Sequence, residues 1–167
     1  MTLYLLSVWL HVLSAAAWIG SMVFLSAVVV PLLRREELRA QAPLLLRLVG
    51  GRYRVLGWIA LATLIVSGAL NLYLRGFTWG TLCQVEFWSR GFGLLLGWKL
   101  ALVLLVLILT VMHEAVVGAR ALALLERDPS SPRAQRVRRT ASWFGRLVGV
   151  VSLVILFLAV AMVRGCA

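Results

Sequence analysis

Residues 3–33 read LYLLSVWLHVLSAAAWIGSMVFLSAVVVPLL and contain no Asp, Glu, Lys or Arg. About 20 apolar helical residues cross a bilayer core, so this stretch is long enough to span a membrane and to tilt or project beyond it. Three further apolar runs follow, at residues 55–74, 92–125 and 141–163. The chain of 167 residues is 62% hydrophobic, against roughly 45–50% in soluble domains. The four runs predict an integral membrane protein.

The length and the Leu, Ala and Val content of the runs favour helices over strands. We expect a single domain, residues 1–167, folded as an all-α up-down four-helix bundle, with helices at about 3–33, 55–74, 92–125 and 132–163. The last helix is expected to begin before its apolar part because Ser131-Pro132 is a typical N-cap and first-position pair. Glu36–Val49 is expected to be a short interfacial segment that Gly50-Gly51 separates from the second helix.

The charge distribution predicts the orientation in the membrane. The net charge is +11, and Lys99 is the only lysine among 17 basic residues. Most arginines follow the first and third runs, which by the positive-inside rule places those loops in the cytoplasm and both termini outside a bacterial inner membrane. Orientation and lipid headgroup contact then account for the charge, and no nucleic-acid binding is expected. The two clusters are Arg34, Arg35, Arg39, Arg47, Arg52 and Arg54, and Arg120, Arg127, Arg133, Arg136, Arg138, Arg139 and Arg146.

Two cysteines fall on the predicted outer side, Cys83 in the second loop and Cys166 at the C-terminus. That side is oxidising in bacteria, so a disulfide between the two cysteines is possible. The alternative is two free thiols. The sequence alone does not give the Cα separation that a disulfide requires.

One polar layer is predicted near the outer face. At 1.5 Å per residue, His11 lies about 12 Å and Lys99 about 10 Å inside their helices, and Ser67 and Asn71 lie near the outer end of the second helix. Trp18 extends the His11 face at i+7. A buried imidazole needs a hydrogen bond or a metal, so His11 is a candidate site residue. The plainer alternatives are that His11 hydrogen-bonds to Asn71 or Ser67 and that Lys99 extends to the outer interface.

His113 does not fit into this layer. It follows Lys99 by fourteen residues, or about 21 Å along one helix. A haem held between His11 and His113 is therefore disfavoured. His113 and Glu114 form either an inner-interface pair without chemistry or a second site near the cytoplasm.

Three segments resemble the copper-resistance protein D (CopD) family: Trp9–Gly20, Arg54–Asn71 and Phe92–Val103. They cover roughly three of the four helices, and the sharpest features are the spacing of seven from His11 to Trp18 and the lysine of the third helix. The same two features resemble the HemJ type of haem-associated membrane protein. The first resemblance implies copper handling, and the second implies that His11 is a haem ligand and Lys99 a site residue. The interval from Lys99 to His113 is about one turn longer than in the HemJ pattern.

Haem and copper make different demands on the chain. Copper paths use several soft ligands, Met or Cys, together with His. Here the candidates are scattered along the sequence: His11, Met162, Cys83 and Cys166. A haem b needs one histidine, an apolar slot and a cation for its propionates, for which Lys99 or Arg75 is available.

The leading prediction is therefore a haem b in the outer leaflet that serves electron transfer or a quinone- or porphyrin-linked redox step. The partners expected are the lipid bilayer and a quinone or a periplasmic redox protein, and small-residue spacings are compatible with a homodimer. Copper transport or tolerance through an outer-facing site is the alternative. A third hypothesis is an accessory membrane subunit in which His11 only hydrogen-bonds between helices.

Overall fold

The computed structural model describes residues 1–33, 35–38, 41–117 and 131–164. These residues are organised as helices and connections without any strand. Four helical segments in this part of the chain are long and apolar enough to cross a membrane, namely Thr2–Leu32, Leu44–Leu74, Gly91–Ala115 and Pro132–Arg164. The prediction of an all-α, multi-pass membrane protein is therefore confirmed. The contacts divide the chain into two compact units, Met1–Val85 and Glu86–Ala167, and each unit is described by itself.

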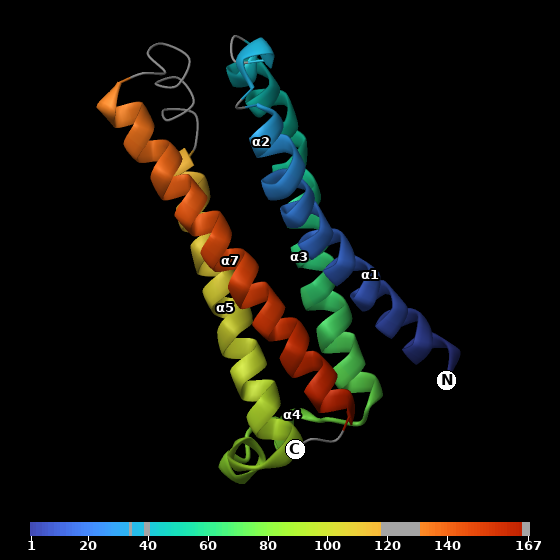
Figure 1. Ribbon diagram of the computed structural model, residues 1–167. Coiled ribbons are helices and arrows are strands. Elements are labelled where there is room, and N and C mark those ends of the chain that lie inside the picture. The colour runs from blue at the N-terminus through green and yellow to red at the C-terminus, as the bar shows by residue number, and fades with distance from the viewer. Residues whose placement is uncertain (34, 39–40, 118–130, 165–167) are drawn as a thin grey trace. The chain divides into compact units, whose positions relative to one another are not determined.

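The first unit is an antiparallel helical hairpin. Helix α1 (Thr2–Phe24) continues through a π-helical segment (Leu25–Val29) into the short α2 (Val30–Leu32), and α3 (Ala42–Leu74) returns alongside α1 (Figure 1). A 3-10 turn (Glu36–Leu38) lies in the connection, and the short α4 (Trp79–Leu82) follows α3. The first apolar run is thus helical over its predicted length.

The π-helical segment has a local cause. Pro31, in the first turn of α2, lies two residues after the end of this segment. Proline has no N–H to donate to the carbonyl of Ala27, and its ring would clash with that carbonyl in a regular α-helix. A wider turn before the proline relieves this clash and lets the helix continue to Leu32.

The start of the second membrane helix differs from the prediction. Helix α3 begins at Ala42 rather than near residue 55 and runs through Gly50 and Gly51 without interruption. The predicted interfacial segment Glu36–Val49 is therefore wrong in its second half. Neither glycine has a positive φ. A glycine inside a helix costs only about 1 kcal/mol, which the surrounding leucines and arginines, all good helix formers, can offset.

Helix α3 ends in a Schellman motif. The Gly76 N–H donates to the Tyr73 carbonyl and the Phe77 N–H donates to the Leu72 carbonyl. Gly76 has a φ of 86°, which glycine adopts without steric cost. This motif fixes Arg75 at the end of the helix.

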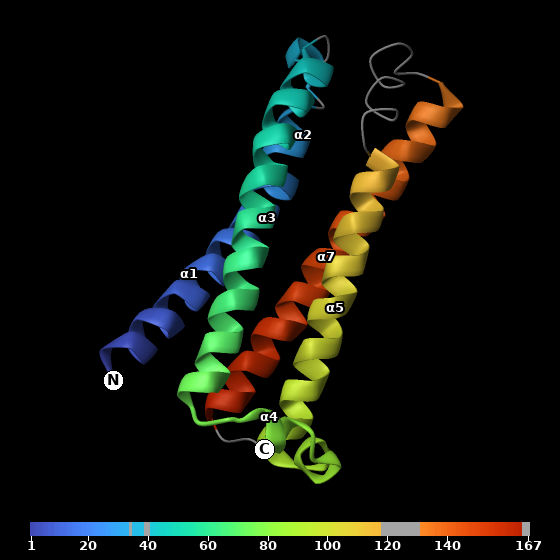
Figure 2. The same cartoon turned by 180° about the vertical axis from the view of Figure 1, so that it is seen from behind.

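The second unit is also a helical hairpin. A 3-10 segment (Val85–Ser89) leads into α5 (Gly91–Val117), which packs along α7 (Pro132–Arg164), as Figure 2 shows from behind. The predicted fourth helix, 132–163, is confirmed. The third was predicted to reach residue 125, and its last eight residues lie outside the described ranges. Gly93 is required where it stands, because a Cβ there would lie 1.8 Å from the Phe87 carbonyl oxygen.

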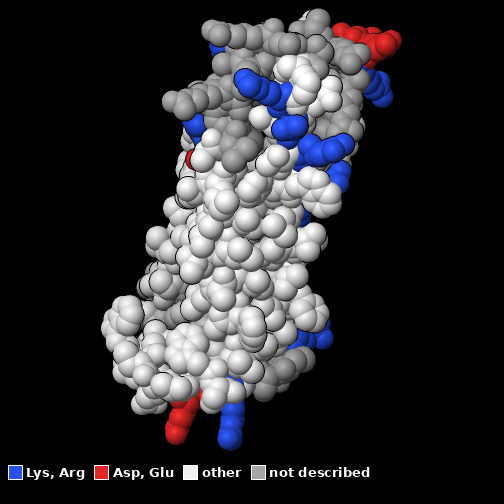
Figure 3. Space-filling model, turned by 90° about the vertical axis from the view of Figure 1, so that its left-hand side faces the viewer, with Lys and Arg blue, Asp and Glu red and all other residues white. Residues whose placement is uncertain are grey.

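The surface of the helices suits lipid rather than water. Large apolar side chains point outward, among them Val66 (67% exposed), Leu104 (58%) and Phe157 (71%). On the face drawn in Figure 3, Lys, Arg, Asp and Glu gather toward the ends, and the middle carries no charge. Unpaired charge is costly in hydrocarbon, so this middle band is the part that contacts the bilayer core.

Candidate functional site

Polar side chains line the contact between α1 and α3 near one end of the first hairpin. We call this group the polar seam. It comprises Tyr4, Ser7 and His11 on α1, Ser67 and Asn71 in the last turns of α3, and Arg75 directly after that helix. On α1, Ser7 and His11 are followed by Ser14 and Trp18 at helical spacing, so all four share one face. Ser7, Ser14, Trp18 and Ser67 are all buried.

The centre of the polar seam is a relay of hydrogen bonds. Nδ1 of His11 lies 2.8 Å from the Ser67 hydroxyl, and that hydroxyl lies 2.5 Å from the Thr63 carbonyl oxygen. A carbonyl can only accept, so the single Ser67 proton points to Thr63. Nδ1 of His11 must then carry a proton and donate it to Ser67. Of the two neutral tautomers of His11, these hydrogen bonds select the one whose lone pair is on Nε2.

Two glycines of α3 make room for the aromatic rings of α1. A Cβ on Gly68 would lie 3.3 Å from Cε1 of His11, and a Cβ on Gly57 would lie 3.1 Å from Cζ3 of Trp18. Both distances are shorter than ordinary carbon contacts. The helices can therefore approach closely only because these positions have no side chain.

Asn71 and Arg75 continue the seam toward the helix end. Asn71 lies one turn beyond Ser67 on the same face of α3, and its Oδ1 is buried without a hydrogen-bond partner among the described residues. One turn further, Nε of Arg75 donates to the Tyr4 hydroxyl over 3.0 Å. Asn71 thus lies between two cross-helix hydrogen bonds, Arg75–Tyr4 and His11–Ser67.

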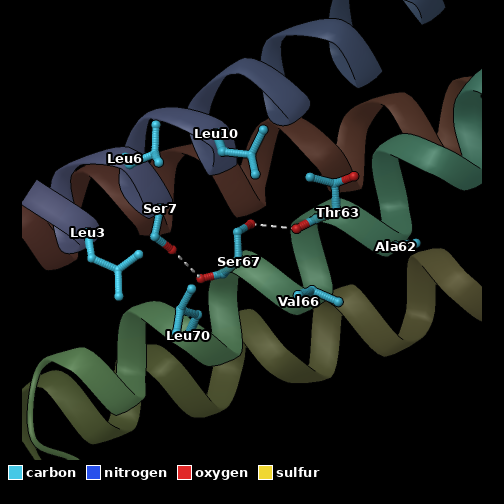
Figure 4. Close-up of a pocket in the computed structure, with 9 residues that line it drawn as sticks. All are labelled: Leu3, Leu6, Ser7, Leu10, Ala62, Thr63, Val66, Ser67 and Leu70. Atoms are coloured by element: carbon cyan, nitrogen blue, oxygen red, sulfur yellow. Dashed lines mark hydrogen bonds between the residues drawn. The ribbon is translucent and has the colours of Figure 1, made fainter.

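A groove of about 350 Å³ opens beside the seam (Figure 4). Its floor contains hydroxyl groups that donate to backbone carbonyls: Ser7 to Ser67 over 3.3 Å, and Ser67 to Thr63. His11 does not line the groove, although it bonds to Ser67, which does. The rest of the lining is Thr63 and six apolar residues, Leu3, Leu6, Leu10, Ala62, Val66 and Leu70.

Three further predicted site residues, Lys99, His113 and Met162, lie in the second unit. Lys99 is half-buried in α5, and His113 packs edge-on against Phe144 of α7 with ring centroids 6.3 Å apart. Met162 lies half-buried on α7. Lys99 and His113 occupy one continuous helix, so their predicted axial separation of about 21 Å holds.

The predicted cysteine pair is only half described. Cys83 is exposed after α4, and Cys166 lies outside the described residues. The disulfide stays a prediction.

Three members of the arrangement were not anticipated as site residues: Tyr4, Ser7 and Gly68. The signal was present in the spacing, since Tyr4 and Ser7 precede His11 by seven and four residues and share its face. Gly68 directly follows Ser67. What the sequence lacks is the register between α1 and α3, and only the fold supplies it.

The fold and the polar seam define a multi-pass, all-α membrane protein with a histidine held between two membrane-length helices. Residues 13–130 match the family described as "Domain of unknown function (DUF4149)", and the chain belongs to this family. The match begins two residues after His11 and includes Ser67, Asn71 and Arg75.

A relative is known over nearly the full length. An "Uncharacterized protein" of Aquifex aeolicus (strain VF5) is 29% identical over 162 residues, which cover 96% of this chain and 95% of that one. No solved structure matches the chain.

Proposed function

We propose that this chain is a redox protein of a bacterial inner membrane that binds a haem b in the outer leaflet through His11. The relay from His11 through Ser67 to Thr63 carries the proposal. Histidines that bind metals usually donate from their other ring nitrogen to a hydrogen-bond acceptor, which fixes the tautomer and the ring orientation. Nδ1 of His11 is held in this way, so Nε2 is the ligand atom.

The donor set fits one axial ligand of a haem. In the described residues, no three His, Cys, Asp or Glu side chains come together as a metal-binding group. A haem needs only one such ligand, with an apolar setting and cations near its propionates. Arg75 lies two turns beyond Ser67 on the same side of α3 and suits a propionate. A bound haem would supply one-electron chemistry, for which a quinone or a periplasmic redox protein is the expected partner.

The test is the visible spectrum of the protein purified from haem-replete cells. A Soret band is expected, and His11→Gln should abolish it while the size-exclusion profile stays that of the folded protein. Ser67→Ala should lower haem retention about tenfold, the smaller of the effects seen when an outer-sphere partner is removed. Ser14→Ala, a buried serine three residues from His11, is the matched control and should retain the band. A colourless wild-type protein would exclude the haem.

Two further functions remain candidates, each with its own observation. An accessory membrane subunit is favoured by the His11–Ser67 hydrogen bond itself, which satisfies part of the imidazole without chemistry. Copper handling is favoured by the resemblance to CopD, with His11 as a ligand. The copper content of a colourless preparation distinguishes these two functions. Stoichiometric copper that is lost in His11→Gln supports copper transport, and a wild-type protein without copper supports the accessory role.

The orientation belongs to the same proposal. A membrane-impermeant thiol reagent added to intact cells should label Cys83 if the second loop is outside. Labelling only after the membrane is broken would reverse the orientation and place the polar seam in the inner leaflet.

A further inference from the structure

Three arginines and a tryptophan form a stripe along the first half of α7, the helix drawn from orange to red in Figure 1. We call Arg136, Arg139, Trp143 and Arg146 the basic stripe. All four are exposed, and their spacings of three, four and three residues place them on one face of the helix. Val148, which is buried, lies on the opposite face. The stripe therefore points away from the packed side of α7.

No carboxylate on the same helix balances the charge of the basic stripe. Helix α7 contains neither Asp nor Glu from Pro132 to Arg164. Arginines on a helix surface are often paired with an acidic residue three or four positions away, and no such pair can form within α7. The negative charge that balances the stripe must come from outside this helix.

Arg146 lies at the edge of the part of α7 that can cross the hydrocarbon. Residues 147–163 follow it without a charged residue and extend about 26 Å at 1.5 Å per residue, close to the roughly 30 Å of a bilayer core. The Arg146 guanidinium lies over the Trp143 ring, 5.6 Å from the ring centroid. Because Trp143 precedes it, the guanidinium is directed back toward the start of the helix, which is the direction of the headgroups.

The face that carries the basic stripe continues as an apolar surface. Val150, Val154 and Phe157 follow Arg146 at helical spacing on this face, and all three are exposed. A ligand that covers the whole face thus meets arginines, then an indole ring, then only hydrocarbon side chains. Free phosphate or a nucleic acid matches the charge but not the apolar part. A phospholipid with a net negative headgroup matches both.

We propose that the basic stripe and the apolar surface beyond it bind an anionic phospholipid. The lipid phosphate accepts hydrogen bonds from the guanidinium groups of Arg139 and Arg146, whose forked N–H donors fit phosphate oxygens. Trp143 lies at the level of the glycerol, where indole rings are favoured, and an acyl chain lies along Val150 and Phe157. A zwitterionic lipid has the same phosphate, but its choline cancels the charge, so the anionic lipid binds more tightly.

This site is independent of the function proposed above. It involves neither His11 nor a haem, and it applies to whichever leaflet contains this end of α7. Its test therefore measures lipid binding alone.

The test is a lipid titration of the delipidated full chain in detergent micelles, read by native mass spectrometry. We expect the wild type to bind phosphatidylglycerol about 25-fold more tightly than phosphatidylcholine, from about fivefold for each of the two arginines beside the phosphate. Arg139→Gln combined with Arg146→Gln should weaken phosphatidylglycerol binding by about this factor and leave phosphatidylcholine binding nearly unchanged. Equal binding of the two lipids by the wild type would overturn the proposal.

Arg52→Gln combined with Arg54→Gln is the matched control. It removes two exposed arginines from α3, and Arg54 likewise directly precedes an apolar run. Residues two apart do not share a helix face, so these arginines cannot hold one phosphate together. The control should keep the preference for phosphatidylglycerol. If it lost as much as the α7 variant, net charge rather than the stripe would select the lipid, and the proposal would be overturned.

Two further measurements examine the parts of the site. Trp143→Leu should weaken phosphatidylglycerol binding about threefold, the effect of an exposed cation–π contact. Glycerol phosphate, which lacks acyl chains, should not displace the bound lipid. Displacement by glycerol phosphate would mean that the apolar surface plays no part, and the lipid site would be overturned in favour of a simple phosphate site.

Discussion

The two hairpins are of similar size but are held together differently. In the first, buried serines, a histidine and glycines lie where α1 meets α3, and hydrogen bonds cross between the helices. In the second, the described buried residues of α5 are Gly93, Leu96, Val106 and Leu109, and those of α7 include Val148, Val151 and a single serine, Ser152. Lipid is as apolar as leucine, so neither hairpin can rely on the hydrophobic effect in the membrane. Polar contacts restrict the helix register more than apolar packing does, and a site that needs fixed geometry is expected in the first hairpin.

The largest effect on stability should come from the packing of the second hairpin. Leu96→Ala removes a side chain that is only 4% exposed and should lower the free energy of unfolding by about 2–3 kcal/mol through the cavity it leaves. Unfolding by SDS in mixed micelles measures this. Leu104→Ala, on a surface that is 58% exposed, is the control and should cost less than about 0.5 kcal/mol. Equal losses in the two variants would mean that packing does not hold this hairpin.

The next effect tests the close approach in the first hairpin. Gly57→Val places atoms against the indole of Trp18, where even a Cβ would lie 3.1 Å away. We expect a loss of about 1–3 kcal/mol, as for other overpacked sites. Gly20→Val serves as the control because a Cβ there meets nothing within 4 Å. A Gly57→Val protein as stable as Gly20→Val would show that α1 and α3 can separate at little cost.

A smaller effect is expected for the hydrogen bond at the centre of the seam. Ser67→Ala and His11→Gln should show a coupling of about 0.6–1.7 kcal/mol in a double-mutant cycle, the range found for interhelical hydrogen bonds in membranes. Thr110→Val in α5 removes a hydroxyl that bonds only within its own helix, to the Val106 carbonyl. That change should be nearly neutral. A coupling of zero between Ser67 and His11 would remove the distinction between the two hairpins.

The smallest effect belongs to the exposed end of the seam. Tyr4→Phe deletes the acceptor of the Arg75 hydrogen bond. Because both groups reach water or lipid headgroups there, the loss should stay below about 0.5 kcal/mol in the same SDS titration. If Tyr4→Phe lost more free energy of unfolding than Ser67→Ala, the Tyr4–Arg75 hydrogen bond would stabilise the first hairpin more than the His11–Ser67 hydrogen bond does.

Much of the fold was predictable because a long apolar run identifies a membrane-spanning helix. The absence of charge in residues 3–33 was sufficient to predict the first membrane helix. The Ser131-Pro132 pair was sufficient to predict where the last helix begins. The start of α3 was not predictable from Gly50-Gly51, since a glycine pair ends a helix only when the chain takes a positive φ there, and here it does not. The wide turn before Pro31 was likewise missed, because a proline signal does not say how the helix will relieve the clash.

The sequence by itself determined the number of membrane-length helices and the isolation of one histidine among apolar residues, since hydrocarbon penalises charge wherever it falls. Only the tertiary structure decided that His11 meets Ser67 rather than Asn71, that the Ser67 proton goes to Thr63, and that Asn71 is left with a buried acceptor. The physical reason is register: helical spacing places residues on a face, but the sliding and rotation of α1 against α3 decide which of them touch. That register depends on Gly57 and Gly68, whose missing side chains let the rings of Trp18 and His11 pack against α3.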